Sequence, residues 1–492
     1  MSTSITIDMI ANATILDIQG WFQDGQLTAA ELVLLYLERI ARYDRSGPHL
    51  NAIIEVNPDA YHIAQGLDQE RQLRGPRGPL HGIAVLLKDN VATGDKMHTS
   101  AGSLALKEVY APQDAFVAER LRAAGAVILG KTNLTEWANF MTKNMPNGYS
   151  SRGGQVLNPY GPGHIDPGGS SSGSGSAVAA GLATVAIGTE TSGSILSPSS
   201  QHGLVGIKPT VGLISRFGII PISFSQDTAG PMCRTVSDAA LVLGALTGVD
   251  ARDPATSASE GLYNVDYASG LTQDGLKGAR LGVARGVFVE HIEPWQETLF
   301  NQAIHDLKEA GATIVDPIDI PTASELKDYT VLVYEFKVAL NAYLNWLGER
   351  SPVTSLADVI GYNEANADVC LAYGQTVMLE SERTSGSLAD PDYIDARTRD
   401  LYLGQKHGID QALSEHRLDA LVFPANFGAA IAAKAGYPSI TIPSGFSPQG
   451  EPFGVTLTAR AFEESALIRW AYAYENATQH RKAPVMADSP AS

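Results

Sequence analysis

Serine residues are concentrated in two neighbouring stretches of the chain, and a serine hydroxyl can serve as a nucleophile. Residues 168–176 read GGSSSGSGS, and residues 188–200 read GTETSGSILSPSS. A serine becomes nucleophilic only when a nearby group accepts its proton. Tracts rich in glycine and serine are also typical of flexible linkers. Residues 168–176 can therefore be interpreted as a linker or as part of a catalytic site.

No histidine lies in an evident catalytic setting, so the base that would activate such a serine is not obvious from the histidines. The histidines are scattered along the chain, among them His81, His98, His164, His202 and His291. No HExxH pattern and no Cys/His pairing occurs, which disfavours a metal site. Lysine can replace histidine as the base when burial lowers its pKa.

Lys88 is the lysine that fits this requirement, because it ends the apolar run GIAVLL of residues 82–87. An exposed lysine at the end of a strand would be unremarkable, with its stem lying along apolar surface. A buried lysine there would need hydrogen-bonding or charged partners for its ammonium group. The residues alone leave both interpretations open.

The second serine stretch offers a turn in which backbone N–H groups can gather. Gly193 and Ser194 follow the apolar segment of residues 184–188 after a few residues. Consecutive N–H groups in such a turn can point at one oxyanion. An ordinary turn is the alternative.

Two familiar patterns occur without the structural context that they need. Residues 125–132 match the phosphate-binding pattern GxxxxGKT, but their central AVIL predicts a buried strand rather than a loop that exposes N–H groups. Residues 169–173 match the GxSxG pattern of α/β-hydrolases, but the preceding GPGHIDPG cannot form the strand that this elbow must follow. We therefore expect neither a nucleotide site nor a hydrolase elbow.

Composition excludes several functional classes. The chain of 492 residues has a net charge of −18, which disfavours binding to nucleic acid or to anionic membranes. Its two cysteines, Cys233 and Cys370, cannot form a disulfide framework. No apolar stretch is long enough to span a membrane and no signal peptide is visible, so we expect a cytoplasmic location.

Strands and helices alternate in the predicted elements, which indicates an α/β architecture. Thr28-Ala-Ala-Glu31 is a capping box that opens a helix. Predicted helices cover 28–43, 115–124, 174–183 and 461–480, and predicted strands cover 50–56, 82–90, 126–130, 184–190, 418–425 and 438–444. Residues 279–316 predict a strand–helix–strand unit, and residues 198–231 a packed irregular region. We expect one domain over residues 1–492, with the mostly helical residues 325–415 as a cap.

Taken together, these stretches resemble the amidase signature family. The matching segments occur in the family's order: PLHGIAVLLKDN (79–90), GAVILGKTNLTEWA (125–138), NPYGPGHIDPGGSSSGSGSAVAAG (158–181), GTETSGSILSPSSQHGLVGIKPTVG (188–212), SQDTAGPM (225–232) and AGYPSITIPSG (435–445). The resemblance covers nearly the whole chain. It implies a large mixed β-sheet core covered by helices on both sides, and amide hydrolysis without a cofactor or metal.

The resemblance also implies roles for individual residues. Ser194 would be the nucleophile, Ser170 the serine that relays protons and Lys88 the base. The peptide bond between Gly169 and Ser170 would be cis, and Ser171 would support the network by hydrogen bonding. The oxyanion hole would consist of the backbone N–H groups of Thr191, Ser192, Gly193 and Ser194. Ala138 and Asn139, just after the segment GKTNLTEW, are expected to border the substrate pocket.

Within the family, residues 188–232 look most like the peptide amidases, which remove the C-terminal amide of peptides. Ser192 and Leu196 depart from the glycine and arginine common at these positions, which leaves the substrate open. Aryl, fatty-acid, carbamate and small aliphatic amides are the alternatives. A different class, the A-type component of a glutamyl-tRNA amidotransferase complex, usually keeps that glycine and arginine. We expect an amide substrate, no nucleic-acid or membrane partner, and a monomer or homodimer.

Overall fold

An eleven-stranded sheet forms the centre of the molecule in the computed structural model, which describes residues 5–486. Its strand order is β1-β3-β2-β6-β8-β7-β12-β13-β11-β9-β10. Strands β3, β2 and β6 run parallel, as do β11, β9 and β10, whereas the central pairs from β6 to β13 are antiparallel. The sheet is therefore mixed, as the resemblance implied.

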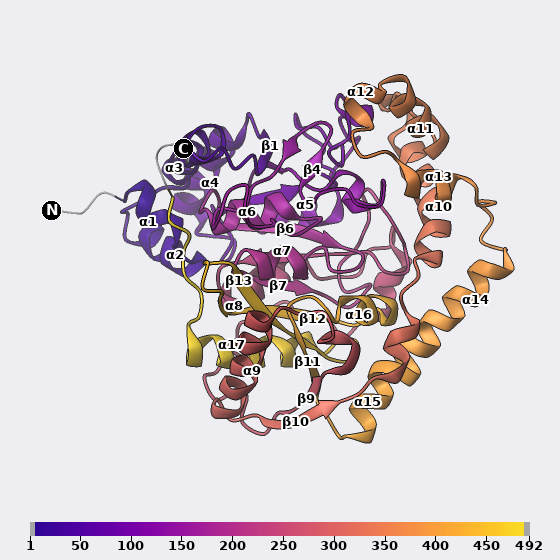
Figure 1. Cartoon of the computed structure of the whole chain (residues 1–492). Helices are drawn as coiled ribbons and strands as arrows, with labels where there is room; N and C mark the ends of the chain where they lie inside the picture. Colours follow the sequence, from indigo (N-terminus) through magenta and orange to yellow (C-terminus); the bar gives the residue numbers. More distant parts are fainter. Residues whose placement is uncertain (1–4, 487–492) are drawn as a thin grey trace.

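The strands of this sheet, and the short pair β4–β5 beside it, are shown in Figure 1. Their bounds are β1 (Ile53–Val56), β2 (Ala84–Lys88), β3 (Val127–Thr132), β4 (Tyr149–Ser150), β5 (Gly154–Gln155), β6 (Val185–Glu190), β7 (Val205–Lys208), β8 (Thr228–Cys233), β9 (Arg280–Ala284), β10 (Thr313–Ile318), β11 (Ala420–Pro424), β12 (Ser439–Phe446) and β13 (Pro452–Thr458).

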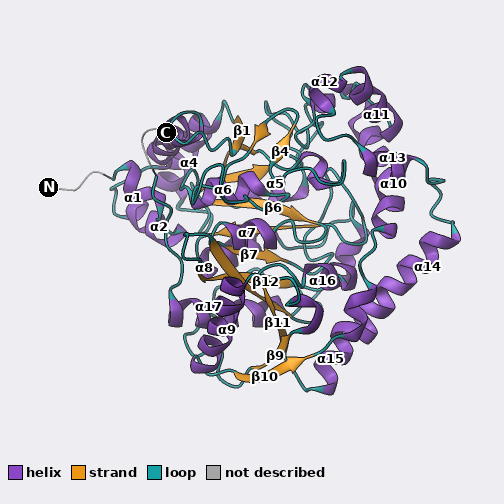
Figure 2. Cartoon of the chain, viewed as in Figure 1, coloured by secondary structure: helices purple, strands orange, loops and turns teal. Residues whose placement is uncertain are grey.

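Helices cover both faces of the sheet (Figure 2). The α-helices are α1 (Ile7–Ala11), α2 (Ile15–Gln23), α3 (Ala29–Arg39), α4 (Ala60–Arg74), α5 (Phe116–Ala123), α6 (Ser172–Ala179), α7 (Leu196–Gln201), α8 (Val236–Leu246), α9 (Pro294–Glu309), α10 (Thr330–Leu347), α11 (Leu356–Ala365), α12 (Ala367–Cys370), α13 (Thr376–Glu382), α14 (Pro391–Asp400), α15 (Asp410–Glu415), α16 (Ala429–Ala435) and α17 (Glu464–Thr478). Two π-helical segments, η1 (Ile40–Asp44) and η8 (Leu401–Ile409), continue α3 and α14. Short 3-10 turns are η2 (Leu104–Leu106), η3 (Glu136–Asn139), η4 (Pro254–Ser259), η5 (Gly286–Phe288), η6 (Pro321–Glu325) and η7 (Gly348–Arg350).

Local sequence signals account for several of these elements. The predicted capping box at Thr28 and Glu31 is present and begins α3. All residues of β2, β3 and β6 are buried, which explains why their apolar runs were recognisable as strands. The AVIL segment of the phosphate-loop pattern lies at the start of β3, so the prediction of a strand there is confirmed.

The predicted helical stretch 325–415 contains α10 to α15, and α10 to α14 lie along one side of the sheet (Figure 1). Its role as a cap within a single domain remains a prediction. Within residues 5–486, no helix is both long enough and apolar enough to cross a bilayer.

The prediction of an irregular region over residues 198–231 is wrong at both ends and at one segment within it. Helix α7 extends to Gln201, β7 lies within the region, and β8 begins at Thr228. Proline and glycine obscured these elements, although β7 and β8 are central strands whose residues are all buried. Strand β13 and helices α4, α8 and α16 were not predicted from the sequence.

Candidate active site

Lys88 lies at the carboxyl end of β2, between β3 and β6, and its side chain is completely buried. Its ammonium nitrogen Nζ donates to Ser170 Oγ at 2.7 Å, to Ser171 Oγ at 3.0 Å and to the Thr189 carbonyl oxygen at 3.3 Å. Burial lowers the pKa of Lys88 to about 7, although the carboxylates of Glu190 and Asp227 oppose the shift. A substantial fraction of Lys88 is therefore neutral near pH 7.

Ser170 and Ser171 lie in the loop that leads into α6, and both are completely buried. The Gly169–Ser170 peptide bond is cis, as the resemblance implied. Ser171 Oγ donates to the Thr189 carbonyl oxygen at 3.1 Å. The backbone N–H of Ser171 donates to the Ser194 carbonyl oxygen at 3.2 Å, which brings the two serine stretches together. Residues 168–176 are thus a packed part of the site rather than a linker.

Ser194 lies in the turn between β6 and α7, and its exposure distinguishes it from the other two serines. Ser194 is 8% exposed and borders a cavity, whereas Ser170 and Ser171 are 0% exposed. Of the three, Ser194 is therefore the one that a substrate can reach. No hydrogen bond joins the hydroxyls of Ser170 and Ser194 within the described chain. Catalytic hydrogen bonds are often long in the absence of substrate.

Glu190, which the sequence analysis did not assign, holds this turn in shape. Its carboxylate accepts the backbone N–H groups of Gly193 at 2.8 Å, Ile195 at 2.7 Å and Leu196 at 3.0 Å. Gly193 has a φ of 85°, a conformation that glycine adopts without steric cost. A carboxylate at the end of a strand, followed by a glycine-containing turn into a helix, was the signal available in the sequence.

This arrangement corrects the expected oxyanion hole at one position. The N–H of Gly193 is directed at Glu190 and is not free to bind an oxyanion. The backbone N–H groups of Thr191, Ser192 and Ser194 donate to no other group among residues 5–486. These three remain the candidates for the oxyanion hole.

Asp227 ties the same turn to the strand beside β6. Thr191 Oγ1 donates to Asp227 Oδ1 at 2.5 Å, and the N–H groups of Ile222 and Ser223 donate to Oδ2 at 2.8 Å and 2.9 Å. Burial raises the pKa of Asp227 to about 6, against the lowering effect of these hydrogen bonds. Asp227 belongs to the segment SQDTAGPM, and the sequence alone assigned it no role.

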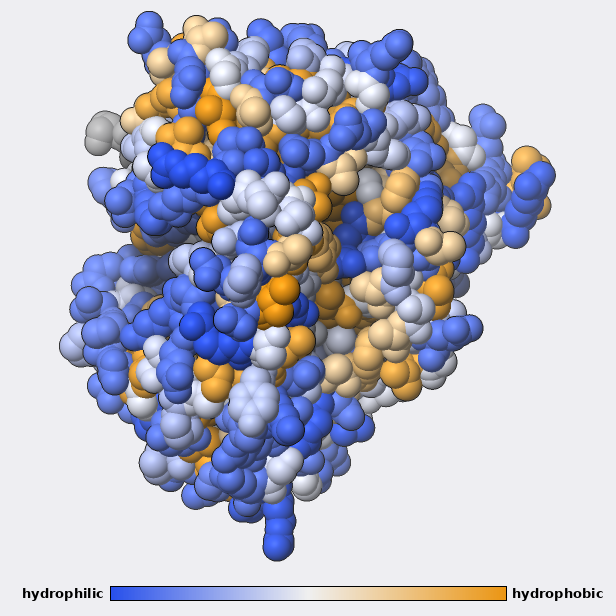
Figure 3. Space-filling model, turned by 90° about the vertical axis from the view of Figure 1, so that its right-hand side faces the viewer, coloured by the Kyte–Doolittle hydropathy of each residue, from blue (hydrophilic) through white to orange (hydrophobic). Residues whose placement is uncertain are grey.

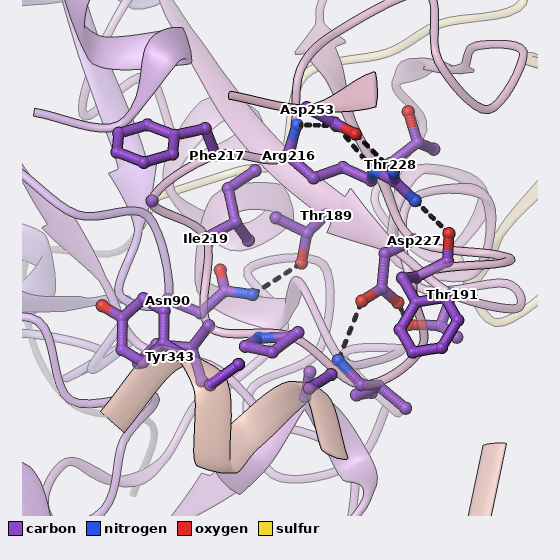
Figure 4. A pocket seen from close by; sticks show the side chains of 18 of the residues that line it. Asn90, Thr189, Thr191, Arg216, Phe217, Ile219, Asp227, Thr228, Asp253 and Tyr343 are labelled. Atoms are coloured by element: carbon purple, nitrogen blue, oxygen red, sulfur yellow. Dashed lines mark hydrogen bonds and ion pairs between the residues drawn. The ribbon is translucent and has the colours of Figure 1, made fainter. Parts of the chain in front are cut away.

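Two cavities meet at this turn. The first, of about 620 Å³, is bordered by Ser192, Ser194, Ala138 and Asn139. The second, of about 450 Å³, is shown in Figure 4 and is also bordered by Thr191. Residues Ala138, Thr191 and Ile222 border both. The structure therefore places Ala138 and Asn139 in a cavity wall beside Ser194.

The described residues offer little for a metal ion. Within residues 5–486, no group of three or more His, Cys, Asp or Glu side chains is arranged to hold one. His81 and His202 are instead buried and hydrogen bonded to backbone carbonyl oxygens. The groups that the site does offer are a buried lysine, three serine hydroxyls and free backbone N–H groups, which suit acyl transfer.

Comparisons with known proteins find relatives of this chain in both sequence and structure. The family model named Amidase matches residues 31–434. A probable amidase of Arabidopsis thaliana is 44% identical over 486 residues, which span 96% of this chain and 92% of the relative. The crystal structure of a peptide amidase from Stenotrophomonas maltophilia superposes with a TM-score of 0.91 at 47% identity, covering 96% of this chain and 98% of that one. The A-type component of the glutamyl-tRNA(Gln) amidotransferase of Chloroflexus aurantiacus is 33% identical, over 96% of this chain and 98% of the relative.

Proposed function

This chain belongs to the amidase family and is a hydrolase that acts on amide C–N bonds, and on that premise we propose that it works through Ser194, Ser170 and Lys88. The observation that carries the proposal is the contact of 2.7 Å between Lys88 Nζ and Ser170 Oγ in a fully buried setting. A neutral lysine can accept a proton from a serine hydroxyl, and burial keeps a large share of Lys88 neutral near pH 7.

In the proposed mechanism, Ser194 Oγ attacks the amide carbonyl carbon. Its proton passes to Ser170 Oγ while the proton of Ser170 passes to Lys88 Nζ. The C–N bond of the tetrahedral intermediate then breaks, and the leaving nitrogen takes a proton from Ser170, which Lys88 replenishes. Water repeats these steps on the acyl-enzyme, releasing the acid and restoring Ser194.

The negative charge that develops on the carbonyl oxygen is assigned to the N–H groups of Thr191, Ser192 and Ser194. Preformed donors in a water-poor site stabilise such a charge without reorganisation. Glu190 and Asp227 support this role, because their hydrogen bonds fix both ends of the turn. Ser171 supports Lys88 as a second acceptor of its N–H groups.

We propose C-terminal peptide amides as the substrates. The 47% identity with a peptide amidase over 96% of the chain supports this class. The cavity of about 620 Å³ beside Ser194 is large enough for an acyl group of several residues. Aryl, fatty-acid, carbamate and small aliphatic amides are the competing substrates.

A panel of amides tests the substrate class. The enzyme, purified without partners, is offered a C-terminal peptide amide, an anilide and a short aliphatic amide, and released ammonia and amine are measured separately. The proposal expects ammonia release from the peptide amide with the highest kcat/KM. Activity that requires added partner proteins would favour a component of an amidotransferase complex, to which the 33% identity with the Chloroflexus protein points.

Variants of neighbouring serines test the assignment of the nucleophile. Ser194→Ala is expected to abolish ammonia release with the fold intact. Ser197→Ala, a half-buried serine in the same segment, serves as the matched control and should retain activity. Full turnover by Ser194→Ala would refute the proposal.

A further inference from the structure

Glu335 is a buried carboxyl group on helix α10, and the proposed mechanism gives it no role. Its side chain is 0% exposed and borders neither of the two cavities at the candidate active site. Its Oε2 accepts the hydroxyl of Ser223, the hydroxyl of Ser225 at 2.9 Å and the backbone N–H of Ser225 at 3.1 Å. Its Oε1 accepts the hydroxyl of Tyr393 on α14 at 2.9 Å. Glu335 therefore joins two helices to the loop that precedes β8.

The same loop reaches Thr191 through the carboxylate of Asp227. Ser223 takes part in both connections, because its hydroxyl donates to Glu335 while its backbone N–H donates to Asp227 Oδ2 at 2.9 Å. Asp227 Oδ1 in turn accepts the hydroxyl of Thr191 at 2.5 Å (Figure 4). A continuous path of hydrogen bonds thus runs from α10 to Thr191, whose backbone N–H is a candidate for the oxyanion hole.

Packing alone does not account for a carboxyl group at position 335. All of its hydrogen bonds come from hydroxyl and backbone groups, and no ion pair of Glu335 occurs among residues 5–486. Burial of a carboxyl group without a cation is costly even when hydrogen bonds compensate. An apolar side chain would fill the same space without that cost. The carboxyl group is therefore best explained by the loop that it holds.

Helix α10 also forms part of the wall of the substrate space. Leu332 borders the cavity beside Ser194, and Ala339 borders the second cavity, so Glu335 lies between two lining positions of one helix. Figure 3 faces the side of the molecule on which α10 lies, and apolar residues gather near the middle of this face. Glu335 thus ties the loop before β8 to a helix that lines both cavities.

We propose that Glu335 is a positioning residue for amide hydrolysis, which holds residues 222–225 so that Asp227 keeps Thr191 oriented toward the oxyanion. The negative charge on the carbonyl oxygen develops only as the amide is attacked, so the transition state should depend on Glu335 more than bound substrate does. This role rests on the proposed function, since it presupposes attack by Ser194 and an oxyanion at the Thr191 N–H.

Glu335→Leu tests this role, with kcat and KM measured on the amide that the enzyme hydrolyses with the highest kcat/KM. We expect kcat to fall about tenfold and KM to change less than about twofold, the pattern of an interaction made in the transition state. Glu335→Gln should restore most of the activity. Its amide oxygen can accept from the two serines while its amide nitrogen donates to the hydroxyl of Tyr393.

A double variant tests the path to Thr191. Because Glu335→Leu and Thr191→Val interrupt one path of hydrogen bonds, their combination should lower kcat little more than either variant alone. If Glu335→Leu does not fold, the pair Ser223→Ala and Ser225→Ala removes both loop hydroxyls from Glu335 and takes its place in the same comparison.

Lys337→Met is the matched control on the same helix. Lys337 donates to the backbone carbonyl oxygens of Glu382 and Thr384 and makes no hydrogen bond to the loop of residues 222–225 within the described chain. It should leave kcat unchanged, alone or combined with Thr191→Val.

Three results would overturn the role of Glu335 and leave the proposed function intact. They are losses that multiply in the double variant, a lowered melting temperature with kcat unchanged in Glu335→Leu, and a Glu335→Gln variant as impaired as Glu335→Leu. Full turnover by Ser194→Ala would instead overturn the proposed function, and the role of Glu335 with it.

Discussion

Lys88 Nζ lies 2.7 Å from Ser170 Oγ, and neither side chain is exposed to solvent. The ammonium group has only hydroxyl and carbonyl oxygens as direct partners, with no carboxylate in hydrogen-bond contact among residues 5–486. A lysine without a direct counter-ion in a buried position favours its neutral form. This relationship separates Lys88 from a strand-end lysine that extends into water, the alternative that the sequence left open.

The first prediction concerns pH. The burial that lowers the pKa of Lys88 to about 7 makes the neutral base available above that pH. We therefore expect kcat/KM to be half-maximal near pH 7, to fall about tenfold for each pH unit below it and to level off above. Lys88→Arg, whose guanidinium stays charged, should be inactive at every pH. A flat profile between pH 5 and pH 9 would contradict the role of Lys88.

The second prediction concerns coupling between Lys88 and Ser170. Each of Lys88→Met and Ser170→Ala is expected to lower kcat by about 10²- to 10⁴-fold, the usual contribution of a proton-transfer group. Because both groups serve one proton path, the double variant should be little worse than either single variant. Single-turnover rates of the three variants measure this. If the fold-losses of the two single variants multiply in the double variant, the two residues act independently.

The sequence was sufficient to place Lys88 after an apolar run and to single out the two serine stretches, but it left the burial of Lys88 open. The apolar run before Lys88 and the glycines around Ser170 are visible over about ten residues. Glu190 shows the opposite case. Its role depends on a turn that folds back onto its own carboxylate, which spacing along the chain does not reveal.

The third prediction concerns Thr191. Thr191→Val removes the hydroxyl that bonds Asp227 and keeps the backbone N–H in place. We expect kcat to fall about tenfold with KM nearly unchanged, because the turn loses its anchor while the cavities keep their shape. Thr191→Ser retains the hydroxyl and should restore activity. A variant in which KM alone rises would assign Thr191 to substrate binding instead.

The fourth prediction concerns Glu190. In Glu190→Gln, one carboxylate oxygen becomes an amide nitrogen that cannot accept the backbone N–H groups of the turn. The free energy of unfolding is expected to fall by roughly 1–3 kcal/mol and kcat to fall with it. Chemical denaturation and steady-state kinetics on the same preparation measure both. Loss of stability with full activity would show that the turn tolerates the change and that its geometry is not critical.

The fifth prediction concerns Ala138, which borders both cavities. Ala138→Leu places a larger side chain in the wall that the two cavities share and so reduces the space in both. KM for peptide amides should therefore rise severalfold, while KM for a short aliphatic amide changes little. The enlarged side chain also sits at a φ of 53°, a conformation unfavourable for leucine, so the melting temperature should be measured alongside. An equal rise in KM for both substrates would show that the substitution does not act by reducing the cavity space available to the larger substrate.

The elements missed by the sequence analysis share a physical cause. Strand β8 contains glycine and proline yet lies between β6 and β7 with every residue buried. Strand β13 begins at a proline beside β12. Tertiary pairing overrides the weak local preference of such residues for strands. Lys88, Ser170 and Ser194 could nevertheless be predicted as site residues, because that prediction rests on the order of the motifs rather than on local propensity.

Mass spectrometry of the acyl-enzyme tests most directly whether Ser194 carries the acyl group. The enzyme is mixed with an excess of a C-terminal peptide amide, quenched in acid within milliseconds and digested. We expect the mass of the acyl group on the peptide that contains Ser194, and none in the Ser194→Ala variant. An acyl group on Ser170 or Ser171, or continued turnover by Ser194→Ala, would contradict it.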